Sequence, residues 1–566
     1  MKNGPEMTEQ PRRKNSSAFP KGRSLNEQSG TDILDLVADS ALAHANFPRD
    51  ELIEYLHLIQ DRYGHISPDR LAALAHVMKL SQAEVYETAT FYAHFQVTRD
   101  GDVAPPPLTI RVCNGPSCKM QGAEALVHEL GDLQGGARIE EVPCVGRCDG
   151  APVAALGKNI IPSATAQTVA AATRSGDSKA KIGTYENLDG YLAAEGYQAF
   201  HALMSGVLTR KDVFRELEVS GLRGLGGAGF PVAQKWRFLD GQTKPRVVAV
   251  NADEGEPGTF KDRHLLETQP HRVLEGALIA AFSIEADDVY IYLRDEYPHI
   301  HTILSTEIEQ LMRRALTHGI RLHLRRGAGA YVCGEESAML ESLEGKRGLP
   351  RNRPPFPAQA GLFGRPTLVN NVETLYWVTD ILNTGGADFL ARGRRHFYSV
   401  SGRVKTPGVK LAPAGVTVRQ LIDDYAGGMS EGHVLKGYLP GGASGGLLPA
   451  SLADVPLDFG TLEPYGCFVG SSAVVVLSDH DDVPNLVRDL MDFLAHESCG
   501  QCTPCRSGIP KLQSFLDDPH AHRDIIEELS QVMRDGSICG LGQAAPNPVI
   551  SALRHFSDDF KPKDRA

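Results

Sequence analysis

The sequence predicts a multidomain protein that combines α/β units with purely α-helical ones. The chain has 566 residues, well beyond the length at which a single hydrophobic core stops growing. Helical periodicity dominates both ends, whereas strands alternate with helices in the middle. Eight of the ten cysteines fall into two tight sets, which indicates metal chemistry at two places.

Composition excludes several classes of protein. With 42% hydrophobic and 23% charged residues the chain is typical of a globular protein, and it has no apolar run of about 18 residues that could span a membrane. A net charge of −12 argues against nucleic acid as a partner. No apolar signal segment follows the basic run Arg12–Lys14, so we expect a reducing, cytoplasmic location without disulfides.

The first part of the chain divides into three segments. Residues 1–32 are polar and are predicted to form a disordered arm. Residues 33–97 carry apolar residues three and four apart, which predicts a helical bundle with helix starts at Ser67 and Ser81. Residues 108–175 hold the strands LTIRVC, RIEEVPC and PVAAL around the helical AEALVHEL, so we expect a compact α/β module there.

Three further segments follow. In residues 180–394, RVVAVNAD and ADDVYIYLR are predicted buried strands separated by the helical HRVLEGALIAAF, a pattern typical of a parallel sheet. Residues 395–480 are rich in strands such as FYSVSGRV and VGSSAVVVLSD, and residues 485–555 are again helical.

The first cysteine set is Cys113-x4-Cys118 and Cys144-x3-Cys148. Each pair follows a predicted strand, so the four thiolates can meet at one end of a sheet. Four cysteines suit a [2Fe-2S] cluster or zinc, and these loops are longer than the two-residue loops common in zinc ribbons. The spacing favours the cluster and leaves zinc open.

The second set is Cys499-x2-Cys502-x2-Cys505, a spacing that indicates a [4Fe-4S] cluster with three ligands from one segment. A bacterial ferredoxin has its next cysteine at the position of Ile509, so the fourth ligand must be distant. Cys539 in SICGLGQ is the best candidate, because the glycines beside it let the backbone approach a bulky cluster. Its rivals, Cys333 and Cys467, lie in apolar strand-like settings that favour simple burial.

The stretch RGLGGAGFPVAQKW formally contains the dinucleotide-binding pattern G-x-G-x-x-G at Gly224, Gly226 and Gly229. That fingerprint requires a preceding strand, whereas DVFRELEVSG is predicted helical, so a standard Rossmann site is not expected. The bare backbone could still cradle a phosphate or lie against a flat ring, with Lys235 as a cation. A glycine-rich turn without a ligand is the alternative.

Two further segments carry charged and aromatic groups. NADEGEPGTFKDRH places acidic and amide side chains at the carboxyl end of a predicted strand, where α/β sheets bind ligands. GAGAYVCGEESAMLESLEGKRGLPRNRPPFP adds acidic, cationic and aromatic groups that suit an anionic nucleotide with a stacking ring. A solvated acidic loop is the alternative for the first segment.

Six phrases, in order, match one family: GLGGAGF, NADEGEPGTFKDR, GAGAYVCGEE, PTLVNNVETL, SCGQCTPCRSG and SICGLGQ. Over about residues 180–555 the chain resembles the flavin-carrying, NADH-oxidising subunit of respiratory complex I and its relatives in NAD-reducing hydrogenases and formate dehydrogenases. Residues 30–175 resemble the small [2Fe-2S] subunit of complex I, here fused to the larger one. The resemblance implies a thioredoxin-like [2Fe-2S] domain (108–175), a Rossmann-like FMN/NAD-binding domain (180–394), a ubiquitin-like β-rich domain (395–480) and a helical-bundle [4Fe-4S] domain (485–555).

The resemblance also implies the site residues. Those expected to contact FMN are Gly224, Gly226, Gly227, Lys235, Asn251, Asp253, Glu254, Gly334, Glu335, Asn370 and Asn371. Those expected to contact NAD are Phe230, Phe238, Glu256, Glu336, Arg353 and Phe356. No catalytic acid or base is expected, because hydride moves directly between the two cofactors, with Glu254 and Glu256 tuning the flavin. Leu225, Val232-Ala233 and Arg353 depart from the usual arginine, Thr-Gly and lysine of the family.

Within the family, the fusion and the phrases HLIQDRYG, ATFYAHF, HLRRGAGAYVCGEES and LPGGASGG most resemble the β (diaphorase) subunit of a soluble NAD-dependent formate dehydrogenase. This implies a separate molybdenum- or tungsten-containing α subunit that oxidises formate and passes electrons through [4Fe-4S] and FMN to NAD⁺. The alternatives are a diaphorase subunit of an NAD-reducing hydrogenase or of a complex I-type NADH dehydrogenase. An electron-transfer subunit with a degenerate flavin pocket and a zinc-stapled scaffold are the competing classes.

Overall fold

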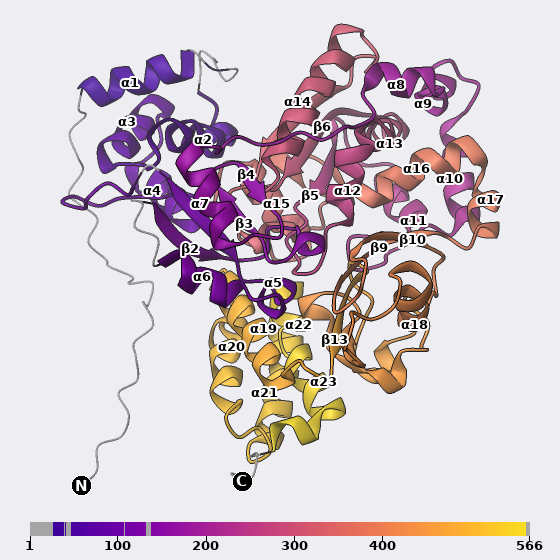
Figure 1. The fold of residues 1–566 in the computed structure, drawn as a ribbon. Helices are drawn as coiled ribbons and strands as arrows, with labels where there is room; N and C mark the ends of the chain where they lie inside the picture. The colour runs from indigo at the N-terminus through magenta and orange to yellow at the C-terminus, as the bar shows by residue number, and fades with distance from the viewer. Residues whose placement is uncertain (1–26, 39, 41–46, 107, 132–136, 562–566) are drawn as a thin grey trace. The chain divides into compact units, whose positions relative to one another are not determined.

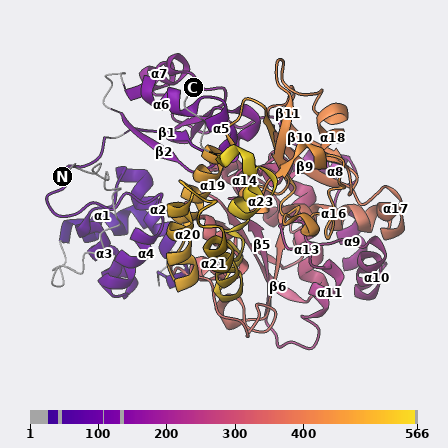
Figure 2. The same cartoon turned by 90° about the horizontal axis from the view of Figure 1, so that it is seen from below.

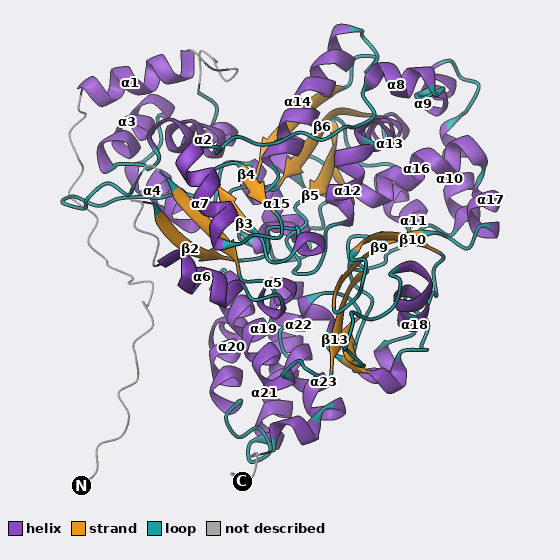
Figure 3. Ribbon diagram, in the orientation of Figure 1, coloured by secondary structure: helices purple, strands orange, loops and turns teal. Residues whose placement is uncertain are grey.

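A computed structural model of the chain describes residues 27–38, 40, 47–106, 108–131 and 137–561. These residues form two compact units. The first unit ends at Phe91 and also includes Phe95–Ala104, and the second comprises Tyr92–His94 and the chain from Pro105 onward. Figures 1 and 3 show the elements of each unit. Within the described ranges, no helix is both long and apolar enough to cross a bilayer.

The first unit is built from four helices: α1 (Glu27–Ala38), α2 (Leu52–Tyr63), α3 (Pro68–Met78) and α4 (Gln82–Phe91). Helix α3 starts where the sequence predicts, because the Ser67 side chain accepts a hydrogen bond from the Arg70 amide and Pro68 occupies the first turn. Helix α2 ends at Gly64, whose φ of 74° is a left-handed conformation that glycine adopts at little cost.

Two predicted boundaries of this region are wrong. Helix α1 begins at Glu27, inside the predicted disordered arm, because Ile33 and Val37 bury one face of the helix; residues 1–26 lie outside the described ranges. The predicted bundle runs too far, since α4 ends at Phe91 and Tyr92–His94 belong to the second unit. There the Tyr92 hydroxyl donates to the Lys346 carbonyl at 2.7 Å.

The second unit begins with a four-stranded sheet of order β2-β1-β3-β4, in which β1 and β2 are parallel and the other pairs antiparallel. The short β4 was not predicted from the sequence. The elements of this sheet are β1 (Thr109–Cys113), β2 (Arg138–Val142), β3 (Ala154–Leu156), β4 (Asn159–Ile161), α5 (Pro116–Met120), α6 (Ala123–Gly131) and α7 (Ala166–Ser175).

The next sheet is fully parallel, with the order β7-β6-β5-β8. Its central strands are almost wholly buried apolar runs, as expected of a parallel sheet covered by helices. The strands are β5 (Arg246–Ala252), β6 (Ala286–Leu293), β7 (Arg321–Arg326) and β8 (Thr367–Asn371). The helices are α8 (Leu188–Ala193), α9 (Gln198–Met204), α10 (Arg210–Ser220), α11 (Val232–Arg237), α12 (Lys261–Thr268), α13 (Pro270–Ser283), α14 (Pro298–Arg313), α15 (Glu336–Leu343), α16 (Val372–Thr384) and α17 (Gly386–Ala391).

A third, mixed sheet follows, with the order β10-β9-β13-β11-β12 and β9 parallel to β13. Its elements are β9 (His396–Gly402), β10 (Gly408–Ala412), α18 (Val418–Gln420), β11 (Leu435–Leu439), β12 (Leu448–Pro449) and β13 (Ala473–Ser478). That this region is ubiquitin-like stays a prediction.

The chain then turns helical, with α19 (Val483–Glu497), α20 (Thr503–Phe515), α21 (Arg523–Gly536), α22 (Gly540–Ala544) and α23 (Asn547–His555). Figures 1 and 2 both show these yellow helices gathered beside one another, and the apolar side chains of α19, α20, α21 and α23 share one core. The cysteine-bearing loop between α19 and α20 is therefore held by a packed helical group.

Candidate functional site

The parallel sheet has a topological switch point between β5 and β8. From β5 the chain steps outward through β6 and β7, and then returns to the other side of β5 as β8. In such sheets the crevice at the carboxyl ends of the two diverging strands is the usual ligand site. Asn251 at the end of β5 lies opposite Asn371 at the end of β8, with Asn370 one position earlier. Three residues predicted to contact FMN therefore share this crevice.

The glycine-rich loop lies against the end of β8. It follows helix α10 and precedes α11, so the prediction that no strand precedes the glycines is confirmed. The Gly224 amide donates to the Phe230 carbonyl at 2.8 Å and closes the loop at its base. A Cβ atom on Gly226 would lie 3.1 Å from Cβ of Asn371, a close approach that favours glycine. Gly227 has open space beside its α-carbon.

Polar atoms in the crevice have room for a ligand. The Asn251 amide donates to the Gly334 carbonyl at 2.8 Å, which brings the loop after β7 against β5. Among the described residues, Oδ2 of Asp253 and Nδ2 of Asn370 are buried without a hydrogen-bond partner. Burial raises the pKa of Asp253 to about 8. Buried polar groups normally have partners, so an acceptor and a donor left over beside a glycine loop fit a flat polar ring such as the FMN isoalloxazine.

A second group of predicted residues gathers at the start of α15. Lys235 pairs with Glu336 at 3.1 Å, and Arg353 pairs with Glu336 at 3.2 Å and also with Glu335. Glu335 caps the helix by accepting hydrogen bonds from two backbone amides of its first turn. The structure thus brings together four residues that the sequence assigned partly to FMN and partly to NAD.

The three aromatic residues predicted to stack on NAD are all unusually exposed. Phe230 and Phe238 have ring centroids 5.8 Å apart and are 39% and 49% exposed. Phe356 is 51% exposed. Exposed rings on the loops that border the crevice offer stacking faces to a flat ligand.

Glu254 and Glu256 have different surroundings. Both carboxylate oxygens of Glu254 are occupied inside the protein, because they accept from the Asp262 amide at 2.7 Å, the Arg263 amide at 3.0 Å and the Tyr297 hydroxyl at 3.0 Å. Burial raises its pKa to about 7. A contact between this side chain and FMN stays a prediction, and the geometry instead makes Glu254 the anchor of α12.

Glu256 lies where three segments meet. It accepts hydrogen bonds from the Tyr331 hydroxyl and from the amide and hydroxyl of Ser444, the last two at 2.7 and 2.9 Å. A Cβ on Gly442 would lie 2.5 Å from its side chain, so the glycine-rich segment after β11 closes directly over it. Burial raises the pKa of Glu256.

The four cysteines of the first set are buried together at the ends of β1 and β2. Cys144 and Cys148 have sulfur atoms 3.3 Å apart. Hydrogen bonds from the thiols of Cys113 and Cys148 hold the pKa of Cys144 well below its ordinary value. Sulfur atoms that already share hydrogen bonds, in a pocket with the apolar Phe260, fit a four-thiolate site.

The loop after β5 reaches this first cysteine set. The Gly258 amide donates to the sulfur atoms of Cys144 and Cys148. Arg294 is 4% exposed and donates to the Cys144 carbonyl at 2.7 Å and to the Glu254 carbonyl. One stretch of chain therefore carries crevice residues at its start and contacts to the first cysteine set a few residues later.

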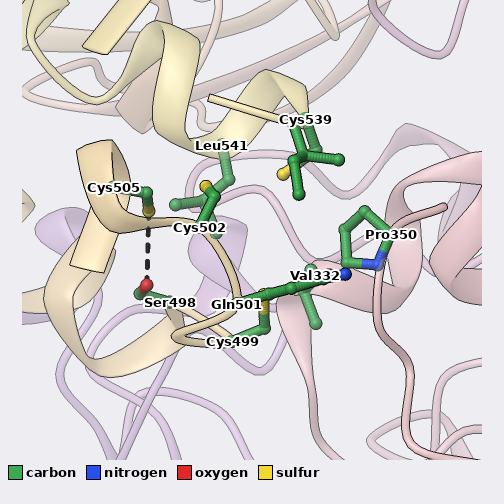
Figure 4. Close-up of a pocket in the computed structure, with 10 residues that line it drawn as sticks. Val332, Pro350, Ser498, Cys499, Gln501, Cys502, Cys505, Cys539 and Leu541 are labelled. Atoms are coloured by element: carbon green, nitrogen blue, oxygen red, sulfur yellow. Dashed lines mark hydrogen bonds between the residues drawn. The ribbon is translucent and has the colours of Figure 1, made fainter. Parts of the chain in front are cut away.

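The second cysteine set lines one pocket with Cys539, as Figure 4 shows. Cys499 and Cys502 lie on the loop between α19 and α20, Cys505 lies in α20, and Cys539 immediately precedes α22. Val332 and Pro350 from the parallel-sheet region complete the wall. Burial raises the pKa of Cys505 to about 12 and that of Cys539 to about 11, so bound metal ions are needed to hold these groups as thiolates.

The other two cysteines lie elsewhere. Cys467 is buried in the core of the mixed sheet, and Cys333 is buried in the turn Tyr331–Gly334 before α15. Neither lines the pocket of the second set. Burial raises the pKa of the Cys467 thiol to about 12 and that of Cys333 further still, consistent with small buried hydrophobic side chains.

Sequence reasoning missed Tyr331, Ser444 and Arg294. Tyr331 contacts Glu256 and, through its amide, Glu497 at 2.9 Å, two residues before Cys499. It thus links the crevice side to the second cysteine set. The only signal was position, because Tyr331 lies inside GAGAYVCGEE and Ser444 inside LPGGASGG; nothing in the sequence pairs segments so far apart.

Comparison with known families agrees with this geometry. Residues 38–175 match the thioredoxin-like [2Fe-2S] ferredoxin family, residues 217–380 the Nuo51 FMN-binding domain, and residues 485–563 the iron–sulfur binding region of NADH-ubiquinone oxidoreductase F. The chain is therefore a flavoprotein with [2Fe-2S] and [4Fe-4S] domains.

Similar proteins narrow the class to one family. The second NADH-quinone oxidoreductase F protein of Rhizobium meliloti (strain 1021) is 39% identical over 66% of this chain and 93% of its own length. The corresponding F protein of Mycobacterium tuberculosis (strain ATCC 25618 / H37Rv) is 42% identical over 67% of this chain and 89% of its own length. The chain belongs to this family of NADH-quinone oxidoreductase F proteins. A crystal structure of an NAD⁺-reducing [NiFe]-hydrogenase in the H2-reduced state includes a chain that is 32% identical, with a TM-score of 0.79 over 92% of this chain and 94% of that one.

Proposed function

We propose that this chain exchanges electrons between NAD(H) and a partner subunit, and that the partner is the molybdenum- or tungsten-containing α subunit of a formate dehydrogenase. The observation that carries the exchange is the placement of both cysteine sets around one crevice. Gly258 and Arg294 contact the first set from the loop after β5 and the end of β6, and Tyr331 joins Glu256 to the helix that precedes the second set.

The residues of the chain bind, orient and exclude water. FMN, when bound, supplies the conversion between a hydride and single electrons. The glycine loop, Asn251, Asn370 and Asn371 would hold its ring and phosphate, and the cysteine sets would hold the clusters. Phe230, Phe238 and Phe356 would offer stacking faces to the nicotinamide nucleotide, while Arg353 and Lys235 would offset its phosphate charge.

The formate assignment rests on sequence phrases and on the fused arrangement of both cysteine-bearing regions. Within the described residues the polar crevice at β5 and β8 and the two cysteine sets account for the sites identified, so formate would be oxidised on another subunit. A second candidate is the diaphorase subunit of an NAD⁺-reducing hydrogenase, favoured by the likeness to a chain of such an enzyme over 92% of this chain.

The exchange reaction is tested with the purified full-length chain. Flavin absorption near about 450 nm together with broad iron–sulfur absorption, and NADH-dependent reduction of a dye, are expected. Brown colour without flavin would indicate a degenerate crevice, and a colourless protein with bound zinc would indicate a scaffold. The partner is tested by affinity purification from cells followed by assays of formate-dependent and H2-dependent NAD⁺ reduction; activity with H2 alone would replace the formate assignment.

Glu256→Gln is expected to change the KM for NADH or the turnover number while FMN stays bound. The substitution removes a negative charge but keeps an acceptor for Tyr331 and Ser444. Steady-state kinetics with NADH and flavin content measure both effects. Glu309→Gln, on the exposed face of α14, is a matched control. Kinetics identical to those of the unmodified chain would remove Glu256 from the nucleotide site.

A further inference from the structure

Two histidines and an aspartate meet at one end of the mixed sheet, in a part of the chain that lies between the two cysteine sets. His433 precedes β11, and Asp479 and His480 follow β13. The two strands are antiparallel with Leu435 opposite Ser478, so the start of one lies beside the end of the other. One possible ligand atom from each of the three residues lies within 4.8 Å of the other two.

Hydrogen bonds already orient two of these side chains. Nδ1 of His433 lies 2.8 Å from the Ser478 hydroxyl, which directs Nε2 of the ring outward. Oδ1 of Asp479 accepts the Val434 amide at 2.9 Å, which leaves Oδ2 toward the histidines. A ligating histidine typically has its second ring nitrogen hydrogen-bonded in this way.

The third side chain faces the other two. Nε2 of His480 lies 3.9 Å from Oδ2 of Asp479, and the rings of His433 and His480 have centroids 4.7 Å apart. The side chains of Asp479 and His480 are 49% and 59% exposed, so an ion can reach them from solution.

The local charge favours a cation. The Val434 amide lowers the pKa of Asp479, so this carboxylate is ionised at neutral pH. Asp481 and Asp482 follow directly, and although Arg403 pairs with Asp481 at 2.7 Å, the turn keeps a negative balance. Asp482 accepts the Asn485 amide at 3.0 Å and caps α19.

We propose that His433, Asp479 and His480 form a binding site for a divalent transition-metal ion of the Zn²⁺ class. Two imidazole nitrogens and one carboxylate oxygen, completed by water, suit Zn²⁺, whereas Ca²⁺ and Mg²⁺ prefer oxygen ligands alone. The ion would fasten the start of β11 to the turn that leads into α19. Because α19 ends at Glu497, two residues before Cys499, the ion would stabilise the support of the second cysteine set.

The test uses the full-length chain purified with its flavin and iron. After dialysis against excess ZnCl2 and then metal-free buffer, zinc and iron per chain are measured by mass spectrometry, and Zn²⁺ affinity by calorimetry. We expect the unmodified chain to retain one more zinc ion per chain than His433→Asn/His480→Asn, with equal iron and flavin in both. Asp479→Asn is expected to weaken Zn²⁺ binding at least tenfold. His201→Asn, at an exposed histidine on α9, should behave like the unmodified chain.

The expected thermal result is a higher melting temperature on adding Zn²⁺ to the unmodified chain and no such rise in the double variant. Equal zinc in the unmodified chain and the double variant would overturn the proposal. Zinc uptake accompanied by an equal loss of iron in both proteins would also overturn it, because the ion would then be binding at the cysteines. Asp479→Asn removes the charge with little change in volume, so it keeps the test valid if the double variant folds poorly.

Discussion

At the pocket beside α20, four thiols come from two segments of the chain. Cys499, Cys502 and Cys505 belong to one segment and Cys539 to another, and all four line the same pocket. Cys539→Ser is therefore expected to lose most of the [4Fe-4S] cluster while keeping the [2Fe-2S] cluster, because a cubane cluster needs its fourth ligand. Iron content and low-temperature EPR measure this. Cys467→Ser and Cys333→Ser are the controls, and a comparable loss of iron in either would contradict the assignment.

Asp253 gives a prediction about pH. Burial raises its pKa to about 8, so the folded protein holds a proton on this group that the unfolded chain releases at about pH 4. Folding stability from this group is therefore largest below about pH 4 and falls as the pH rises toward 8. The groups that face it are Arg294 and His94, which favour ionisation, and Glu296 and Glu497, which oppose it.

The same titration should affect the flavin. The neutral carboxyl group can donate to FMN, whereas the ionised one adds a buried negative charge beside it. FMN affinity is expected to fall above pH 8 by at most about tenfold per pH unit. Flavin fluorescence on release, followed against pH, measures this. Asp253→Asn keeps a donor and should bind FMN without this pH dependence; a variant that keeps the full dependence would place the titrating group elsewhere.

At the scale of elements, patterns within one segment were sufficient for much of the fold. The apolar strand RVVAV and the helix HRVLEGALIAAF are β5 and α13, and the helix before the glycine loop excludes the standard dinucleotide fingerprint, as the sequence predicts. The end of α4 was missed, because ATFYAHF continues a helical pattern while Tyr92 and His94 are held by partners far along the chain. Tertiary contacts of this kind leave no local signal.

The glycine loop is the element whose shape depends most on one residue. A Cβ on Gly226 would lie 3.1 Å from Cβ of Asn371, which caps α16 by accepting the Thr374 amide. Gly226→Ala is therefore expected to displace Asn371 by a few tenths of an ångström and to lower FMN occupancy, with little change in melting temperature because the loop is exposed. Flavin per chain and thermal unfolding measure the two effects. Gly183→Ala, which meets nothing within 4 Å, is the control, and equal flavin in both variants would contradict the expectation.

At the scale of the whole chain, the candidate site depends on contacts between segments that local patterns cannot pair. Glu256 meets Tyr331 and Ser444, which lie 75 and 188 residues away. The cysteine sets could be predicted because ligand spacing is written within short motifs. The residues between the sets and the crevice could not, since tyrosine, serine and arginine are common and their partners are set by the packing of three sheets.

Arg294 is the residue that ties the first cysteine set to the crevice region. It is 4% exposed, donates to the Cys144 carbonyl at 2.7 Å and pairs with Glu296 at 2.8 Å. Arg294→Met would leave the buried Glu296 without this cation, and removing one partner of a buried ion pair costs about 3–5 kcal/mol. We therefore expect a lower melting temperature together with loss or an altered EPR spectrum of the [2Fe-2S] cluster, while the [4Fe-4S] signal persists. Arg215→Met, whose side chain is 61% exposed in its pairs with Asp212 and Glu216, should change neither. Equal loss of both clusters in Arg294→Met would show general unfolding rather than a specific link between the [2Fe-2S] domain and the crevice.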